Sequence, residues 1–196
     1  MVDPMPPPNF LAFAGSLRTA SLNKKLIRVV ADSASAAGAR VTLIDLRDFP
    51  LPLYDGDLEA AEGLPVNARR LKDLFIAHQG LLVACPEYNS SITAVLKNTI
   101  DWVSRQDGAE PGTVPYDGKV AGLFSASPGN FAALRSLETT RGILLQLGVL
   151  VVPQRLAVAR AHEAFTDTGA VREPAVKSAL EAVVASVVKV ATRMNA

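Results

Sequence analysis

Cysteine is almost absent from this sequence of 196 residues, which contains only Cys85. A disulfide framework is therefore impossible, and so is a structural zinc site built on cysteines. A single thiol fits a reducing compartment, so we expect a cytoplasmic protein. Net charge is also small, because 20 basic and 19 acidic residues leave only +1. Without a positive field to attract phosphate backbones, a dedicated nucleic-acid binder is disfavoured.

Long apolar segments are missing as well. The run from Ile143 to Val152 is interrupted by Gln146 and is far shorter than the roughly 20 residues that cross a bilayer, so we expect no membrane partner. The first eight residues have neither the basic start nor the apolar stretch of a signal peptide. We expect residues 1–8 to form a disordered leader and residues 9–196 a single domain, since no repeat or low-complexity tract interrupts them.

Short apolar runs alternate with helical patterns along the chain. Strands are predicted at 10–14, 40–45, 80–85, 119–124 and 149–152, and helices at 21–37, 66–78, 91–104, 131–147 and 173–193. A proline-rich loop is predicted between residues 46 and 65. This alternation predicts an α/β fold with a five-stranded parallel sheet and helices on both faces. Such sheets bind ligands beyond the carboxyl ends of their strands, where the strand order reverses.

The loop after the first predicted strand has the composition of a phosphate site. Gly15 allows a sharp turn, and Arg18 brings a fixed, forked positive charge. Short polar side chains surround it: Ser16, Thr19, Ser21 and Asn23. The following helix directs its free N–H groups and its positive dipole end to the same place. No Gly-Lys-Ser/Thr is present, so ATP hydrolysis is disfavoured. Ser21 alone would also serve as an ordinary helix cap.

Two further loops follow other strands of the sheet, and the topology would place these loops near the first loop. Pro86-Glu87-Tyr88-Asn89 can direct main-chain N–H groups at a flat heterocycle, with Tyr88 covering one face. Cys85 precedes this loop, but a phosphatase would need an arginine at position 91, which is serine. We therefore interpret Cys85 as a small buried strand residue. The small residues of Ser125-Ala126-Ser127-Pro128-Gly129 permit close approach of a ring. Either loop could instead be a simple turn.

These motifs together resemble the NADPH-dependent FMN reductase family. Gly15-Ser16-Leu17-Arg18 with Ser21 and Asn23 is similar to the family's phosphate motif. Pro86-Glu87-Tyr88-Asn89, followed by Leu96-Lys97-Asn98 and Ile100-Asp101-Trp102, is similar to its second motif. The resemblance covers about residues 10–153. It differs at Ala132-Ala133, where the family often has paired glycines.

The resemblance implies a flavodoxin-like fold with strand order 2-1-3-4-5 and FMN at the switch point. Ser16, Arg18, Ser21 and Asn23 would hold the FMN phosphate. Pro86, Glu87, Tyr88 and Asn89 would line the isoalloxazine ring, while Ser125, Ser127 and Gly129 would approach its pyrimidine edge. Lys97, Asn98 and Asp101 would brace the second loop. No catalytic or metal-binding residue is expected.

The implied function is an FMN-containing reductase that takes electrons from NADPH or NADH. Its small-molecule acceptor would be a quinone, a free flavin, an azo compound or a metal oxyanion such as chromate. The alternatives are a flavodoxin-type electron carrier, for which a net charge of +1 offers little docking field, and a binding module without flavin. The resemblance also implies a homodimer or homotetramer, and we expect the helix after the second loop to contribute to its interface.

Overall fold

The computed structural model describes residues 6–194, and most of the expected leader, residues 1–5, lies outside them. Five parallel strands form the central sheet in the order β2-β1-β3-β6-β7, which confirms the predicted order 2-1-3-4-5. Their bounds are β1 Asn9–Ala14, β2 Arg40–Leu43, β3 Gly80–Ala84, β6 Val120–Ala126 and β7 Leu150–Val158. The helices are α1 Leu22–Ala36, α2 Gly56–Glu62, α3 Val66–Ala77, α4 Ala94–Val103, α5 Leu134–Gln146 and α6 Pro174–Met194.

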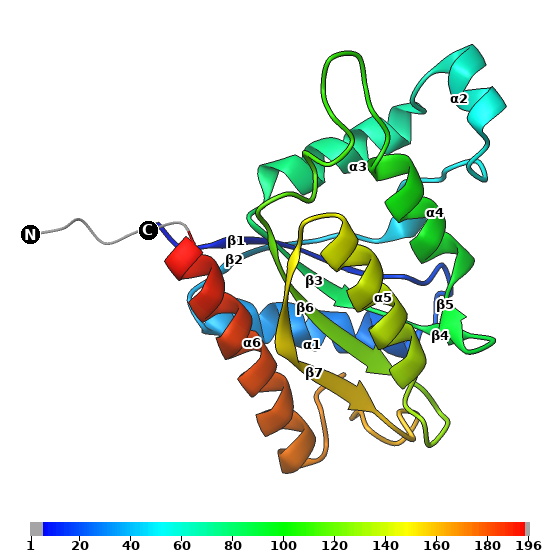
Figure 1. Ribbon diagram of the computed structural model, residues 1–196. Coiled ribbons are helices and arrows are strands. Elements are labelled where there is room, and N and C mark those ends of the chain that lie inside the picture. Colours follow the sequence, from blue (N-terminus) through cyan, green and yellow to red (C-terminus); the bar gives the residue numbers. More distant parts are fainter. Residues whose placement is uncertain (1–5, 195–196) are drawn as a thin grey trace, which may run out of the picture.

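The helices cover both faces of the sheet, as Figure 1 shows. Side chains alternate along each strand, so successive residues of β1 enter two different cores. Phe10 and Ala12 pack with α1 and α6, whereas Leu11 and Phe13 pack with α3, α4 and α5. Burial on both faces explains why the strands read as continuous apolar runs rather than as alternating patterns. No helix among residues 6–194 is long and apolar enough to cross a membrane.

The last strand continues beyond the end that the sequence predicts. The sequence predicts a strand that ends at Val152, directly before Pro153, but β7 runs to Val158. The register of β7 against β6 shifts between Ala121 and Leu123, where Pro153 lies on the opposing strand. Because β7 is an edge strand and the pairing is irregular there, a residue without an N–H is tolerated. The predicted loop over residues 46–65 also differs, since it contains α2 and a short 3-10 helix at Leu46–Asp48.

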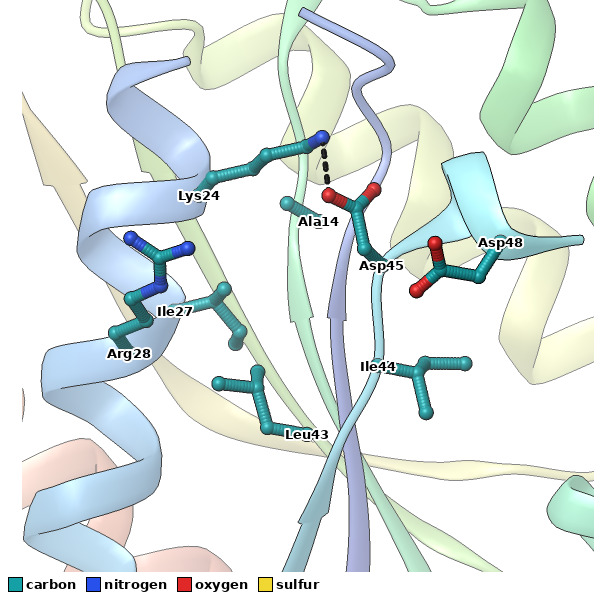
Figure 2. A pocket seen from close by; sticks show the side chains of 8 residues that line it. All are labelled: Ala14, Lys24, Ile27, Arg28, Leu43, Ile44, Asp45 and Asp48. Carbon is teal, nitrogen blue, oxygen red and sulfur yellow. Dashed lines mark hydrogen bonds and ion pairs between the residues drawn. The ribbon is translucent and has the colours of Figure 1, made fainter. Parts of the chain in front are cut away.

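A buried lysine ties the start of α1 to the end of the edge strand β2. Lys24 Nζ lies 2.6 Å from Asp45 Oδ2, and Asp45 Oδ1 accepts a hydrogen bond from the Arg47 N–H. Figure 2 shows this pair above a small cavity flanked by Arg28 and Asp48. Partial burial raises the pKa of Asp45, but the hydrogen bonds from Lys24 and Arg47 outweigh it and lower that pKa overall. The ion pair therefore stabilises the folded state where the carboxyl is ionised.

We expect Asp45→Asn to lower the free energy of unfolding at pH 7 by about 1 kcal/mol, as for a partly exposed ion pair. The folded-state pKa of Asp45 lies below its unfolded value, so this stabilisation is complete above about pH 4 and is lost as the pH falls through the folded value. Urea unfolding at pH 7 and at pH 3 measures the difference. Asp48→Asn is the control, because Asp48 forms no ion pair within residues 6–194. An equal loss at both pH values would contradict this account.

Candidate functional site

Residues from all three loops, at the carboxyl ends of β1, β3 and β6, line one cavity. It lies where the strand order reverses, as expected for this topology. Most of the predicted site residues line it, namely Ser16, Arg18, Ser21, Asn23, Pro86, Glu87, Tyr88 and Ser127, together with Ala20, Leu22, Ala126 and Pro128. Asn89, Ser125 and Gly129 belong to the same loops but do not line this cavity.

The first loop offers donors for an anion. Gly15 is required because a Cβ there would lie 2.8 Å from Leu96 Cβ. Ser21 caps α1, with its Oγ accepting a hydrogen bond from the Lys24 N–H at 3.4 Å. Since α1 begins at Leu22, the N–H groups of Leu22 and Asn23 have no carbonyl one turn earlier and remain available. The Arg18 side chain is exposed and forms no ion pair among the residues described. This donor set fits a phosphate monoester.

The second loop is a β-hairpin, which the sequence prediction missed. Glu87–Tyr88 (β4) pairs antiparallel with Ser91–Ile92 (β5) through a two-residue turn. Asn89 and Ser90 both have positive φ, at 49° and 66°, as a type I′ turn requires. Helix α4 therefore begins at Ala94, after Thr93, rather than at Ser91. Tyr88 stands at the hairpin with 52% of its surface exposed, so one face of its ring can cover a ligand.

We expect Ser90→Gly to stabilise the protein by up to about 1 kcal/mol, because glycine adopts the left-handed backbone without steric cost. Ser90 is exposed, so its removal sacrifices no buried contact. Ser90→Ala is the matched control, since alanine keeps the Cβ that causes the strain. Thermal unfolding of the three proteins measures the effect. A gain in the alanine variant equal to that in the glycine variant would show that the turn is not strained.

The third loop turns sharply just before α5 begins. Ser125 is fully buried, and its Oγ donates to the Ala132 carbonyl at 2.6 Å. Ser127 lines the cavity, and its Oγ accepts a hydrogen bond from the Gly129 N–H. Ala132 and Ala133 both have positive φ, at 51° and 61°, and α5 starts at Leu134 rather than at Phe131. These are the two positions at which the family often has glycine.

Side-chain hydrogen bonds join the loops to one another. Asn23 Nδ2 donates to the Ala126 carbonyl at 2.8 Å, and the Ala126 N–H donates to Asn23 Oδ1 at 3.0 Å. Thr93 Oγ1 donates to the Gly15 carbonyl at 2.7 Å. Ser136 Oγ donates to the Cys85 carbonyl at 2.9 Å. The amide of Asn23 thus holds the first and third loops together. Sequence analysis missed Thr93 and Ser136, whose roles depend on contacts between distant segments.

Other polar residues of the second motif brace a different segment from the one expected. Asn98 Nδ2 donates to the Pro52 carbonyl, and Asn98 Oδ1 accepts a hydrogen bond from the Tyr54 N–H. The buried Trp102 donates its indole N–H to the same Pro52 carbonyl at 2.9 Å. Asn98 and Trp102 therefore hold the proline-rich segment against α4. Lys97 and Asp101 form an exposed ion pair along the helix.

Cys85 follows β3 and is completely buried. Burial raises the pKa of its thiol to about 12, so almost no thiolate exists at neutral pH, and the thiol is not among the cavity-lining groups. The predicted burial of Cys85 is confirmed, although the residue lies just after β3 rather than within the strand. Among residues 6–194, no group of three or more His, Cys, Asp or Glu side chains is arranged to hold a metal ion.

The strand order and the loop cavity at the switch point define a flavodoxin-like α/β protein. Its sequence matches the model of the NADPH-dependent FMN reductase family over residues 8–163, and the chain therefore belongs to that family. The resemblance inferred from the loop motifs is confirmed, and with it the expectation of an NAD(P)H-dependent FMN oxidoreductase.

Relatives and a solved structure agree with this assignment. An NAD(P)H-dependent FMN reductase of Pseudomonas aeruginosa is 35% identical over 161 residues, which cover 81% of this chain and 82% of the relative. A quinone reductase of Escherichia coli is 33% identical over 138 residues, 70% of each chain. The structure of FerB, a flavoenzyme NAD(P)H:(acceptor) oxidoreductase from Paracoccus denitrificans, superposes with a TM-score of 0.78 at 28% identity. It covers 95% of this chain and 98% of FerB.

Proposed function

We propose that this protein passes electrons from NADPH or NADH, through FMN held in the three-loop cavity, to a small quinone. The observation that carries the proposal is the closing of three motif-bearing loops on one cavity in a chain of this family. Quinones are the favoured acceptor class, because several relatives are named quinone reductases or NADPH:quinone oxidoreductases. Free flavins, azo compounds and metal oxyanions such as chromate are the other classes to be tested.

Different residues of the cavity would bind the two ends of FMN, the phosphate and the ring. Ser16, Ser21 and the exposed Arg18 would hold the phosphate, together with the free N–H groups at the start of α1. Pro86, Glu87 and Tyr88 would line the ring, and Ser127 lines the same cavity. FMN, when bound, supplies the hydride-accepting and electron-donating chemistry. The chain itself binds and orients the reactants and, through Tyr88, limits access of water.

Two measurements test the proposed activity. The purified protein should be yellow, or should bind added FMN, and the holoprotein should oxidise NADPH faster when a quinone is present. Flavin binding without acceptor-dependent NADPH or NADH oxidation would favour the flavodoxin-type carrier. Absence of flavin binding would favour a module that keeps the fold alone, and would refute the proposal.

We expect Arg18→Ala to weaken FMN binding by roughly ten- to a hundredfold, since a charge-assisted hydrogen bond contributes about 1.5–3 kcal/mol. Titration of the apoprotein with FMN, followed by flavin fluorescence, measures the dissociation constant. Lys25→Ala is the matched control, because Lys25 is an exposed cation on α1 that does not line this cavity. Equal effects of the two substitutions would show that only the general charge matters, and no effect of Arg18→Ala would remove Arg18 from the phosphate site.

We also propose that the protein forms a homodimer, or a homotetramer built from such dimers. The interface is expected at α4. Two of its apolar residues, Trp102 and Val103, are fully buried within the subunit and leave no surface for a partner. A groove of about 430 Å³ between α4 and α5 is the better candidate. Its apolar side chains are Ile100, Ile143 and Leu147, and Gly142 lies beside them with open space above its Cα.

The unpaired thiol of Cys85 supports the expected cytoplasmic location.

We expect Gly142→Lys to dissociate the oligomer, because a long charged side chain would occupy the groove. Ser178→Lys introduces the same charge at an exposed position on α6, away from the groove, and should leave the assembly unchanged. Light scattering after size-exclusion chromatography reports the molar mass of each protein. A wild-type protein that is monomeric and fully active would contradict the proposal.

A further inference from the structure

Helix α5, which follows the third loop, lacks an N-cap of its own. Its N-cap position is Ala133, which has a left-handed backbone and no side chain able to accept a hydrogen bond. Helices usually satisfy their first N–H groups with a serine, threonine, aspartate or asparagine at this position. The start of α5 therefore needs an acceptor from elsewhere in the chain.

Glu87 of the second loop supplies that acceptor. Its Oε2 accepts hydrogen bonds from the Arg135 N–H at 3.0 Å and from the Ser136 N–H at 3.3 Å. Its Oε1 accepts from Arg135 Nη1 at 3.0 Å, and its side chain is only 14% exposed. Both carboxylate oxygens are thus engaged, and the negative charge lies at the positive end of the helix dipole.

This contact bears on the site because the chain neighbours of Glu87 line the cavity. Pro86 and Tyr88 line the cavity, as does Glu87 itself. Ser127, which lines the same cavity, belongs to the loop that leads into α5 through Ala132 and Ala133. A second bond, from Ser136 Oγ to the Cys85 carbonyl, connects the same two segments. The carboxylate therefore sets the separation between the second and third loops, which form two walls of one cavity.

We infer that the Glu87 carboxylate positions the second loop for the flavin ring by acting through the α5 N-terminus, to which both of its oxygens are bonded. The inference rests on the proposed FMN site. Its physical basis is preorganisation, because loops already held at the correct separation lose less conformational freedom when the ligand binds. The alternative is that Glu87 only stabilises α5, in which case its removal would lower stability without changing FMN affinity.

Three substitutions separate these roles. Glu87→Ala removes the cap, and Glu87→Gln keeps the size and one acceptor oxygen but not the charge. Arg135→Ala is the matched control, because it removes the guanidinium contact while both backbone N–H donors remain. Each apoprotein is titrated with FMN, and its unfolding temperature is measured with and without saturating FMN.

We expect Glu87→Ala to raise the FMN dissociation constant about tenfold or more, on the scale of a lost charge-assisted hydrogen bond. Glu87→Gln should restore part of the affinity, and Arg135→Ala should stay within about twofold of the wild type. The FMN-induced rise in unfolding temperature should shrink in the same order, because that rise follows the affinity. If Glu87→Ala does not fold, the comparison of Glu87→Gln with Arg135→Ala carries the test.

A lower unfolding temperature of Glu87→Ala combined with wild-type FMN affinity would overturn the inference and leave Glu87 as a structural cap. Equal loss of affinity in Arg135→Ala and Glu87→Ala would also overturn it, because the guanidinium and not the helix N-terminus would then be the important partner. Failure of the wild type itself to bind FMN is a separate result, which would refute the proposed function.

Discussion

Two hydrogen bonds between the Asn23 amide and the backbone of Ala126 hold the site together. They join the first turn of α1 to the end of β6, so the first and third loops meet at fixed separation. Thr93 performs the same task between the first and second loops, and Glu87 and Ser136 do so between the second and third. The cavity exists because each loop is tied to the other two, rather than because any one loop is rigid alone.

The sheet and its two cores provide the platform for this arrangement. Strands β1, β3 and β6 are buried on both faces, and they bring their carboxyl ends to one edge. Gly15 permits the close contact with Leu96 that brings α4 under the first loop. The Lys24–Asp45 pair secures the other side of α1 to the edge strand. The start of α1, which is the proposed phosphate site, is thus held from both sides, and this would limit the reorganisation that ligand binding requires.

Backbone strain is concentrated around the cavity. Ser90 at the hairpin, and Ala132 and Ala133 before α5, adopt the left-handed conformation that residues other than glycine and asparagine disfavour. Such strain persists only where the surrounding structure enforces it. Here the enforcing contacts are identifiable: β4–β5 pairing at the hairpin, and the bonds from Ser125 and Glu87 at the third loop.

The five strands of the central sheet, the helices that cover it and the loops at the switch point could be predicted from sequence, because they depend on local periodicity and on residues adjacent in the chain. Gly15 and Ser21 show their structural roles, in the sharp turn and in the cap of α1, through position alone. Only the tertiary structure decided that Pro153 lies within a strand, that Asn89-Ser90 is a hairpin turn and that Glu87 caps a helix 48 residues away. The first and the last of these depend on partners distant in sequence, namely the pairing of β7 as an edge strand and the uncapped start of α5. No local pattern can carry that information, because the interaction that selects the conformation arises only when the chain has folded. The hairpin is local, since Tyr88 pairs with Ser91 only three residues later, but Asn89-Ser90 is a weaker turn signal than Asn-Gly.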